Sequence, residues 1–471
     1  MNARRYITLL PIMCLLLTGC GLLGSPDGST EEFSSYIPRG SRSDHSGNAS
    51  STNAPTSSSS RPTSSQSKTS GTSKEPSVPT GQVADRITYW CAPSDSQIMD
   101  ALIQGFKESN PAYANVAIEC SNIVDMWAAA DQLMADPSVA ADVLFFNDEY
   151  LDDVARGDLL APLDGSLVND FISPDATSAC FYNGVQYAYP VSSHNSPIPF
   201  YDGTFLSQED VSSLETILQK SASAGKKVCL DLRNGWYNPC MFWAGGGTLD
   251  LQSDGSLKAS FDVEQLTGDR TIEAFERFKE LYNQYRDTIL VSSDSMIVES
   301  GFADHSVSYA LLWNDYDMLH GQNPYVDCAP WPSVTIGSRF VPLDCFASYK
   351  LVACNGSMDP GRRYAAHAFA AFLAGEEAQQ LRCEELGECP TNNYLLGYPE
   401  AINHPYYRTI AQMIGSGRTH VQGLSTNDYF WNEFALVGAI ITNGTDSWGS
   451  YRNAKELLRS LLTNLAGQHG I

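Results

Sequence analysis

The sequence is poor in basic residues and lacks the short motifs that mark common active sites. Lysine and arginine together number 29, against 54 aspartates and glutamates, which gives a formal net charge of −25. A field of that sign repels nucleic acid and anionic lipid, so neither is expected to bind the folded part. Gly-x-Ser-x-Gly, His-Glu-x-x-His and the phosphate-binding Gly-x-x-x-x-Gly-Lys pattern are all absent, which disfavours the enzymes that use them.

Histidine is also scarce, and the cysteines do not form a metal-binding motif. The eight histidines are scattered and no Cys-x-x-Cys occurs, so no metal, redox centre or other cofactor is expected. Ten of the twelve cysteines lie beyond residue 90, and an even number in an exported chain suggests disulfides. Cys383 and Cys389 are close enough for a local bridge, whereas Cys91 and Cys120 end two predicted strands and are expected side by side.

The start of the chain has the pattern of an export signal. A short basic start precedes an apolar stretch over residues 6–17, which is too short to span a bilayer but suits a signal peptide. It ends in Leu-Thr-Gly-Cys, which resembles the bacterial lipobox. The resemblance implies that residues 1–19 are removed and that Cys20 carries diacylglycerol, which would hold the protein on the extracellular face of the cytoplasmic membrane. The alternative is an ordinary signal peptide with a chance cysteine.

Residues 20–85 are expected to form a lipidated N-terminus and a disordered linker. Serine, threonine, proline and glycine dominate this stretch, and it has too few apolar residues to offset the entropy of ordering. A coil of this length reaches roughly 40–50 Å. It therefore suits a tether that holds a folded body above a membrane.

From Arg86 onward, strand patterns alternate with helix patterns. Such alternation predicts α/β lobes with mostly parallel sheets and helices on both faces. Strands are predicted at 87–91, 116–120, 142–146, 226–232, 308–313 and 346–353. Helices are predicted at 98–106, 127–134, 150–156, 272–285, 363–374, 429–441 and 451–465.

The order of these pieces is similar to that in extracellular solute-binding proteins of the maltose-binding type. The resemblance covers residues 86–471, and its motifs are loose one by one but specific in their order and spacing. They are FKESNP at 106–111, ADVLFF at 141–146, GDLLAPL at 157–163, NGVQYAYP at 183–190, GGG at 245–247 and CPTN at 389–392. Ten cysteines are a departure from the family pattern, as is the polar segment 192–195.

This resemblance implies a two-lobed periplasmic-binding-protein-like fold of type II, with a hinge between the lobes and a ligand in the cleft. Crossovers are inferred near Pro190 and in the 325–345 and 385–400 regions. The first lobe would then comprise 86–191 and 335–388, and the second 192–330 and 392–471. The implied partners are a carbohydrate and the permease subunits of an ABC importer, with the binding protein a monomer.

A sugar offers apolar faces and a rim of hydroxyls, so its site needs flat rings and hydrogen-bonding side chains. Alignment with the family assigns stacking aromatics to Phe146, Trp236, Trp313 and Trp431. The competing interpretation makes Phe146 a core residue and Trp431 a core residue of its helix.

Polar candidates follow the same strands. The family alignment assigns a hydroxyl-binding carboxylate to Glu149, and Asp315 adds a second beside Trp313. Asp95 follows the first strand, where helix capping is favoured over ligand contact and both roles are compatible. His194 lies in a crossover, which needs polar groups for its own backbone.

The expected function is therefore capture of a carbohydrate, with an oligosaccharide favoured by the aromatic content, and no catalysis. Two alternatives remain open. One keeps the fold but uses it as a ligand sensor for a membrane kinase, and the other is a secreted glycan-active hydrolase, which needs a pair of carboxylates.

Overall fold

The computed structural model describes residues 84–123, 126–163, 172–251, 257–259, 270–292, 294–313, 316–417, 419–421 and 428–468. By its internal contacts the chain divides into residues 1–75 and 76–471. The predicted signal peptide, Cys20 and the linker up to residue 83 lie outside the described residues. The described part of the second unit forms the body of the protein.

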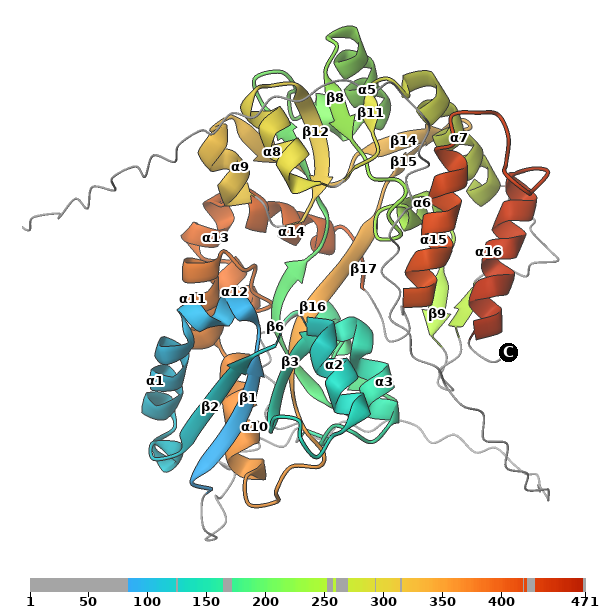
Figure 1. Ribbon diagram of the computed structural model, residues 1–471. Coiled ribbons are helices and arrows are strands. Elements are labelled where there is room, and N and C mark those ends of the chain that lie inside the picture. The colour runs from blue at the N-terminus through green and yellow to red at the C-terminus, as the bar shows by residue number, and fades with distance from the viewer. Residues whose placement is uncertain are drawn as a thin grey trace, which may run out of the picture. The chain divides into compact units, whose positions relative to one another are not determined.

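The first lobe of the body is built on a six-stranded mixed sheet (Figure 1). Its centre is parallel, because β1 pairs with β2 and with β3 in the same direction. The strand that leaves for the other lobe, β6, is antiparallel to β16, and β16, which returns from that lobe, is antiparallel to β3 and parallel to β17. The strands are β1 (Arg86–Cys91), β2 (Ala117–Asn122), β3 (Val143–Asn147), β6 (Ala188–Asn195), β16 (Cys345–Cys354) and β17 (Thr419–Val421).

Helices cover both faces of this sheet. In α10 the buried residues Ala366, Phe369, Ala370 and Leu373 recur at helical spacing, so one side of the helix packs on the sheet. The helices of the lobe are α1 (Met99–Ser109), α2 (Met126–Ala135), α3 (Leu151–Arg156), α4 (Pro174–Ser178), α10 (Arg363–Leu373) and α11 (Glu376–Leu386). A short hairpin pairs β4 (Phe181–Tyr182) with β5 (Val185–Gln186).

The second lobe has a five-stranded sheet in the order β11-β8-β12-β7-β13. Here too the centre is parallel, and β7, which enters from the first lobe, is antiparallel to both its neighbours. The strands are β7 (Ile198–Asp202), β8 (Lys227–Cys229), β11 (Ile289–Leu290), β12 (Val307–Leu312) and β13 (Val326–Cys328). Two hairpins add β9 (Leu249–Leu251) with β10 (Leu257–Ala259) and β14 (Ser333–Ile336) with β15 (Arg339–Pro342).

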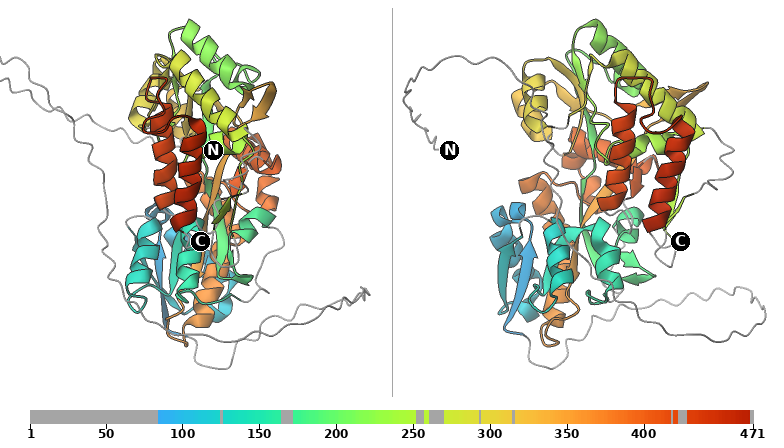
Figure 2. Two further views of the ribbon diagram at one scale, coloured as in Figure 1. Left: turned by 90° about the vertical axis from the view of Figure 1, so that its right-hand side faces the viewer. Right: turned by 45° about the vertical axis from the view of Figure 1, so that its right-hand side comes forward.

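The helices of the second lobe come from both halves of the chain. In α5, Ser213 caps the first turn by accepting a hydrogen bond from the Thr216 amide, and Leu214, Ile217 and Leu218 face the core. The long helices α15 and α16 pack side by side (Figure 2). The helices are α5 (Leu214–Ser223), α6 (Pro239–Ala244), α7 (Arg270–Tyr285), α8 (Ser295–Ala303), α9 (Tyr316–Gln322), α12 (Asn393–Leu396), α13 (Pro399–Asn403), α14 (Pro405–Gly415), α15 (Asp428–Ile441) and α16 (Ala454–Gln468).

Three segments join the lobes. The strands β6 and β16 run from one lobe toward the other (Figure 1). The third segment is the chain around Cys389 and Pro390, which lies beside β6. The Ser193 amide donates a hydrogen bond to the Cys389 carbonyl, and Ser192 forms an isolated β-bridge with Pro390. Paired crossing strands of this kind allow the lobes to rotate as rigid bodies about a narrow waist.

One lobe boundary differs from the sequence prediction. The sequence places residues 335–346 in the first lobe, but Val334, Ile336, Leu343 and Phe346 belong to the hydrophobic core of the second. The hairpin β14–β15 packs on α5 and α7, which explains the difference. The crossing strand β16 begins at Cys345, the last residue of the 325–345 region in which the sequence analysis expected a crossover.

Candidate functional site

Three of the predicted tryptophans come from separate segments of the second lobe. Trp236 lies between β8 and α6, Trp313 directly follows β12, and Trp431 is in the first turn of α15. The first two therefore stand beyond the carboxyl ends of parallel strands, where open α/β sheets bind their ligands.

The structure brings these three rings together. The centroids of Trp236 and Trp431 are 3.9 Å apart at an interplanar angle of 13°, so the rings are stacked. Trp313 stands edge-on to Trp236, with centroids 5.4 Å apart and an angle of 81°. Trp431 is only 8% exposed, whereas Trp236 and Trp313 are partly exposed. Trp236 and Trp313 thus form a corner of two nearly perpendicular rings, and Trp431 supports it from behind.

A second layer of aromatic residues holds the corner in place. Phe346 of β16 packs edge-on against Trp431 and Trp243, with centroids 4.7 and 4.6 Å away. Trp243 in turn stacks on His420, whose Nε2 lies 2.9 Å from an oxygen of Asp344. Trp243 is 9% exposed and therefore serves as packing beside the glycines that follow it.

Two glycines permit the close approach that stacks Trp236 on Trp431. A Cβ on Gly235 would lie 2.1 Å from the Trp431 carbonyl oxygen, and one on Gly438 would lie 1.8 Å from the Leu232 carbonyl oxygen. Neither position has room for a side chain, because the obstacle in each case is backbone. The Asn234 side chain accepts a hydrogen bond from the Trp236 amide at 2.9 Å and so fixes the turn that carries this ring.

The predicted residues at the end of β3 are more deeply buried. Phe146 is 2% exposed and lies in the core of the first lobe, so the structure supports the core interpretation for it. Glu149 is 5% exposed, and its Oε1 accepts a hydrogen bond from the side-chain Nδ2 of Asn147 at 3.5 Å. Asp148 accepts a hydrogen bond from the Ser348 hydroxyl at 2.8 Å, and burial raises the pKa of its carboxyl well above the usual range.

Asp95 has a structural partner that the sequence pattern does not reveal. Its two carboxylate oxygens accept hydrogen bonds from Arg382 at 2.6 and 2.8 Å, and both side chains are at most 1% exposed. The Tyr89 hydroxyl donates to the same carboxylate at 3.3 Å. Because this carboxylate is fully engaged inside the lobe, we leave Asp95 out of the proposed site. Nor does its side chain cap the adjoining helix.

Arg382 belongs to a larger buried network that reaches the hinge. Its guanidinium lies 3.6 Å from Glu388, which also accepts a hydrogen bond from Lys350 of β16 at 2.8 Å. Two positive and two negative side chains are thus held between the first lobe and two of the crossing segments. Arg382 is 287 residues beyond Asp95 in the chain, and nothing local in the sequence marks the pairing.

Two predicted site residues cannot be placed in this arrangement. Asp315 lies outside the described residues. His194 is in β6, but its side chain is outside the described part. Both therefore remain predictions.

The cysteines differ from the sequence prediction. All ten cysteines in the described part of the body are free thiols, so the bridge between Cys383 and Cys389 is not formed. Cys120 is paired with Tyr89, and Cys91 with Asn122, which makes Cys91 and Cys120 diagonal neighbours on adjacent strands. Neither residue is therefore directly opposite the other, and both are free thiols. Burial, with a contribution from Asp95, raises the pKa of Cys91 to about 12 and that of Cys120 to about 11.

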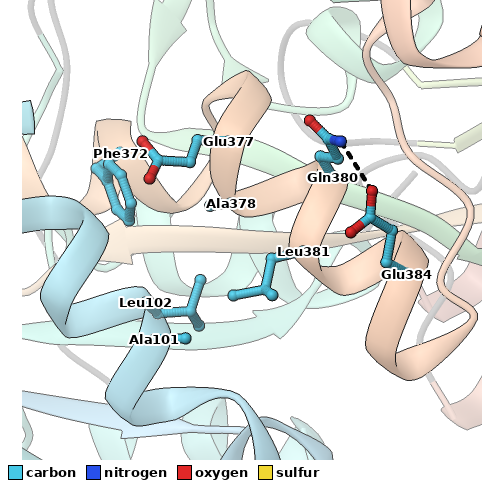
Figure 3. Close-up of a pocket in the computed structure, with 8 residues that line it drawn as sticks. All are labelled: Ala101, Leu102, Phe372, Glu377, Ala378, Gln380, Leu381 and Glu384. Carbon is cyan, nitrogen blue, oxygen red and sulfur yellow. Dashed lines mark hydrogen bonds between the residues drawn. The ribbon is translucent and has the colours of Figure 1, made fainter. Parts of the chain in front are cut away.

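Among the described residues, two hollows lie away from the tryptophan corner. One, of about 260 Å³, is a groove between α1 and α11, where Leu102 and Leu381 form an apolar floor and Glu377 and Glu384 a polar rim (Figure 3). The other, of about 460 Å³, lies at the hinge between α4 and α14. In the residues that the structure describes, no group of three or more potential ligands is placed to hold a metal ion. No helix in that same part is long and apolar enough to cross a membrane.

The structure has two α/β lobes, three crossing segments that join them, and an aromatic corner on the second lobe. This arrangement is that of two-lobed binding proteins. The chain belongs to the bacterial extracellular solute-binding protein family, whose sequence model matches residues 101–399. This confirms the family recognition and the fold class that the sequence analysis reached. A search of curated protein sequences finds no match.

Solved structures show the same fold at low sequence identity. The maltodextrin-binding protein MalE1 of L. casei BL23 is 17% identical, with a TM-score of 0.70 over 82% of this chain and 100% of that one. A cyclo/maltodextrin-binding protein in complex with maltotetraose is 17% identical, with a TM-score of 0.66 over 83% and 98%. The maltose-binding protein MalE of Listeria monocytogenes in complex with maltose is 12% identical, with a TM-score of 0.65 over 82% and 99%.

Proposed function

We propose that the protein captures a carbohydrate between its two lobes and delivers it to the membrane permease of an ABC importer. The observation that carries this proposal is the meeting of Trp236, Trp313 and Trp431 from three distant segments. Flat rings suit the apolar faces of a sugar, and a corner of two perpendicular rings fits a face and an edge of the same ring. Membership of a family of binding proteins, and the sugar ligands of its structural neighbours, support the same assignment.

The polar candidates of the proposed site come from both lobes. Glu149 follows the carboxyl end of β3, and Asp315 and His194 remain candidates for the sugar hydroxyls. A carboxylate that accepts hydrogen bonds from hydroxyls strengthens binding more than a neutral group does. Rings on the second lobe and Glu149 on the first would make full binding depend on closure of the hinge.

Calorimetric titration of the purified protein with a sugar panel tests this proposal. The panel comprises maltose, maltotetraose, cellotetraose and xylotetraose, with leucine as a non-sugar control. We expect at least one sugar to bind in the micromolar range, equivalent to about −8 kcal/mol. Small-angle scattering should then show a smaller radius of gyration with that sugar than without it. Binding of leucine alone, or of a sugar without any compaction, would count against interlobe capture.

We also propose that the protein is held at the extracellular face of the cytoplasmic membrane through lipid on Cys20. The Leu-Thr-Gly-Cys sequence at residues 17–20 and the export of the whole family support this. Two acyl chains bind a membrane stably where one does not. In cells labelled with a palmitate analogue, the wild-type chain should carry label and sediment with membranes, whereas Cys20→Ser should carry none. Equal labelling of both would exclude this attachment.

A further inference from the structure

The hollow at the hinge has walls from both lobes. Ser173, Pro174 and Asp175 line it from the start of α4, whose Ala176 is in the core of the first lobe. Leu396 and Ile414 line it from the opposite side and pack against the core of the second lobe. The floor is the crossing chain itself, at Ser193, Pro390 and Thr391. At about 460 Å³, it lies within the size range of small-molecule sites.

The polar groups of this hollow leave one unneutralised charge. The Ser193 hydroxyl donates to the Cys389 carbonyl at 3.3 Å, and the Thr391 hydroxyl donates to the Pro190 carbonyl at the same distance. Both hydroxyls therefore serve the crossing segments. The exposed carboxylate of Asp175 forms no ion pair among the described residues. Asp175 is the acidic side chain among the residues that line the hollow, and no lysine or arginine lines it.

The charge of Asp175 also acts on a buried tyrosine of a crossing strand. Tyr349 of β16 is fully buried, and burial raises the pKa of its hydroxyl far above the usual range, with the charge of Asp175 as the next cause. Asp175 itself is exposed, so solvent and salt screen its attraction for a positive charge. Opposite it lie the apolar side chains of Leu396, Ala411 and Ile414.

We propose that this hollow is a second small-molecule site, which takes an organic cation with a short apolar body. The ammonium group would pair with Asp175, and the apolar body would contact Leu396 and Ile414. The negative field of the chain, −25 in all, raises the local concentration of such a cation. The site is separate from the proposed sugar site, because none of its lining residues belongs to the tryptophan cluster.

Occupancy of this site is coupled to the lobe angle. A rotation of one lobe against the other changes the separation of Asp175 and Ile414, which belong to different lobes. A cation that fits one separation better than another shifts the hinge equilibrium toward it, and a sugar that closes the lobes changes cation affinity by the same factor. This coupling rests on the proposed sugar binding, whereas the cation site itself does not.

The test is a titration of the purified protein with butylammonium chloride. 1-Butanol controls for the apolar chain, and ammonium chloride at equal ionic strength controls for the charge. Saturable binding of butylammonium, with at least tenfold weaker binding of both controls, is expected. If ammonium chloride binds as tightly as butylammonium chloride, the binding is a general attraction of cations to an acidic protein, and the proposed site is overturned.

Two variants locate the binding. Asp175→Asn removes the charge and should weaken butylammonium binding by about tenfold, whereas Glu385→Gln, at an exposed acid on α11, should leave it unchanged. Ile414→Trp fills the hollow and should abolish binding. A tryptophan at position 414 risks misfolding. If the two variants give different answers, the result for Asp175→Asn is decisive, because its side chain is exposed. Equal affinity in Asp175→Asn and wild type would refute the assignment.

Coupling is measured once a sugar ligand is known. The dissociation constant of the sugar should change at least threefold in saturating butylammonium and not in saturating ammonium. In Asp175→Asn the change should disappear. A sugar affinity that is unchanged when the cation site is saturated would disprove the coupling. If no sugar binds at all, the proposed function is contradicted, and the cation site is then judged by the butylammonium titration alone.

Discussion

The first lobe buries charged side chains in pairs, whereas the second gathers aromatic rings and leaves two of them partly exposed. In the first lobe, Asp95 is held by Arg382, and Lys350 by Glu388. In the second, Trp236 and Trp313 present a corner to solvent. A polar residue at a strand end is therefore a weaker indication of ligand contact than an exposed aromatic one, because internal partners satisfy the polar residue first.

The largest expected effect follows from breaking the charge network of the first lobe. Arg382→Met leaves Asp95 and Glu388 buried without their guanidinium, which should cost about 3–5 kcal/mol of unfolding free energy. Arg86→Met is the matched control, because its ion pair with Glu119 is half exposed and should be worth less than about 1 kcal/mol. Urea denaturation measures both, and equal losses would show that the buried network is not special.

A pH dependence sharpens the same comparison within the first lobe. Burial raises the pKa of Asp152 from 3.8 to about 7, and Asp153 adds to the shift. The folded state therefore binds this proton more tightly than the unfolded chain does. The contribution of the group to stability is complete below pH 4 and is lost as the pH rises through 7, at most about 4 kcal/mol.

Asp152→Asn should remove that dependence. The variant should be more stable than wild type at pH 8 and gain little at pH 4. Asp153→Asn, at the exposed neighbour, should keep the direction of the wild-type profile with a smaller change, because burial of Asp152 remains while the charge of Asp153 is lost. Unfolding free energies at both pH values test this, and a wild type that gains stability from pH 4 to 8 relative to Asp152→Asn would reverse the assignment.

The aromatic corner of the second lobe should be sensitive to one methyl group. In Gly235→Ala the new Cβ collides with the Trp431 carbonyl, so the turn must shift and carry Trp236 with it. We expect a loss of about 1–3 kcal/mol in stability and at least tenfold in sugar affinity. Gly321→Ala in α9 is the control, because its Cβ meets nothing within 4 Å. Unchanged sugar affinity in Gly235→Ala would separate the corner from binding.

Periodicity predicts part of the fold, and it misses helices such as α5, α8, α11 and α14. The predicted strands and helices agree with the structure within a few residues, as at β1, α7, β12 and α15, because their apolar residues recur at the spacing of a half-buried strand or helix. The prediction for the hairpin β14–β15 is wrong about its lobe, because its partner helices α5 and α7 are distant in sequence. Local pattern carries no information about such packing.

The site is predictable only in part. The family resemblance leads us to expect Trp236, Trp313 and Trp431 in one place, and the structure places them in contact. It does not predict the stacking of Trp236 on Trp431, although the two glycines that permit it are visible in the sequence. The partner of Asp95 cannot be foreseen, since Arg382 lies 287 residues away and only the folded sheet brings it near.

The sugar affinity of Trp236→Ala, measured beside that of Trp448→Ala, tests most directly whether the corner holds the solute. Both tryptophans are partly buried in the second lobe, but Trp448 packs against Lys279 rather than in the corner. We predict at least tenfold weaker binding for Trp236→Ala, partial recovery in Trp236→Phe, and an unchanged affinity for Trp448→Ala. Equal affinities in Trp236→Ala and wild type would contradict a role for the corner in binding.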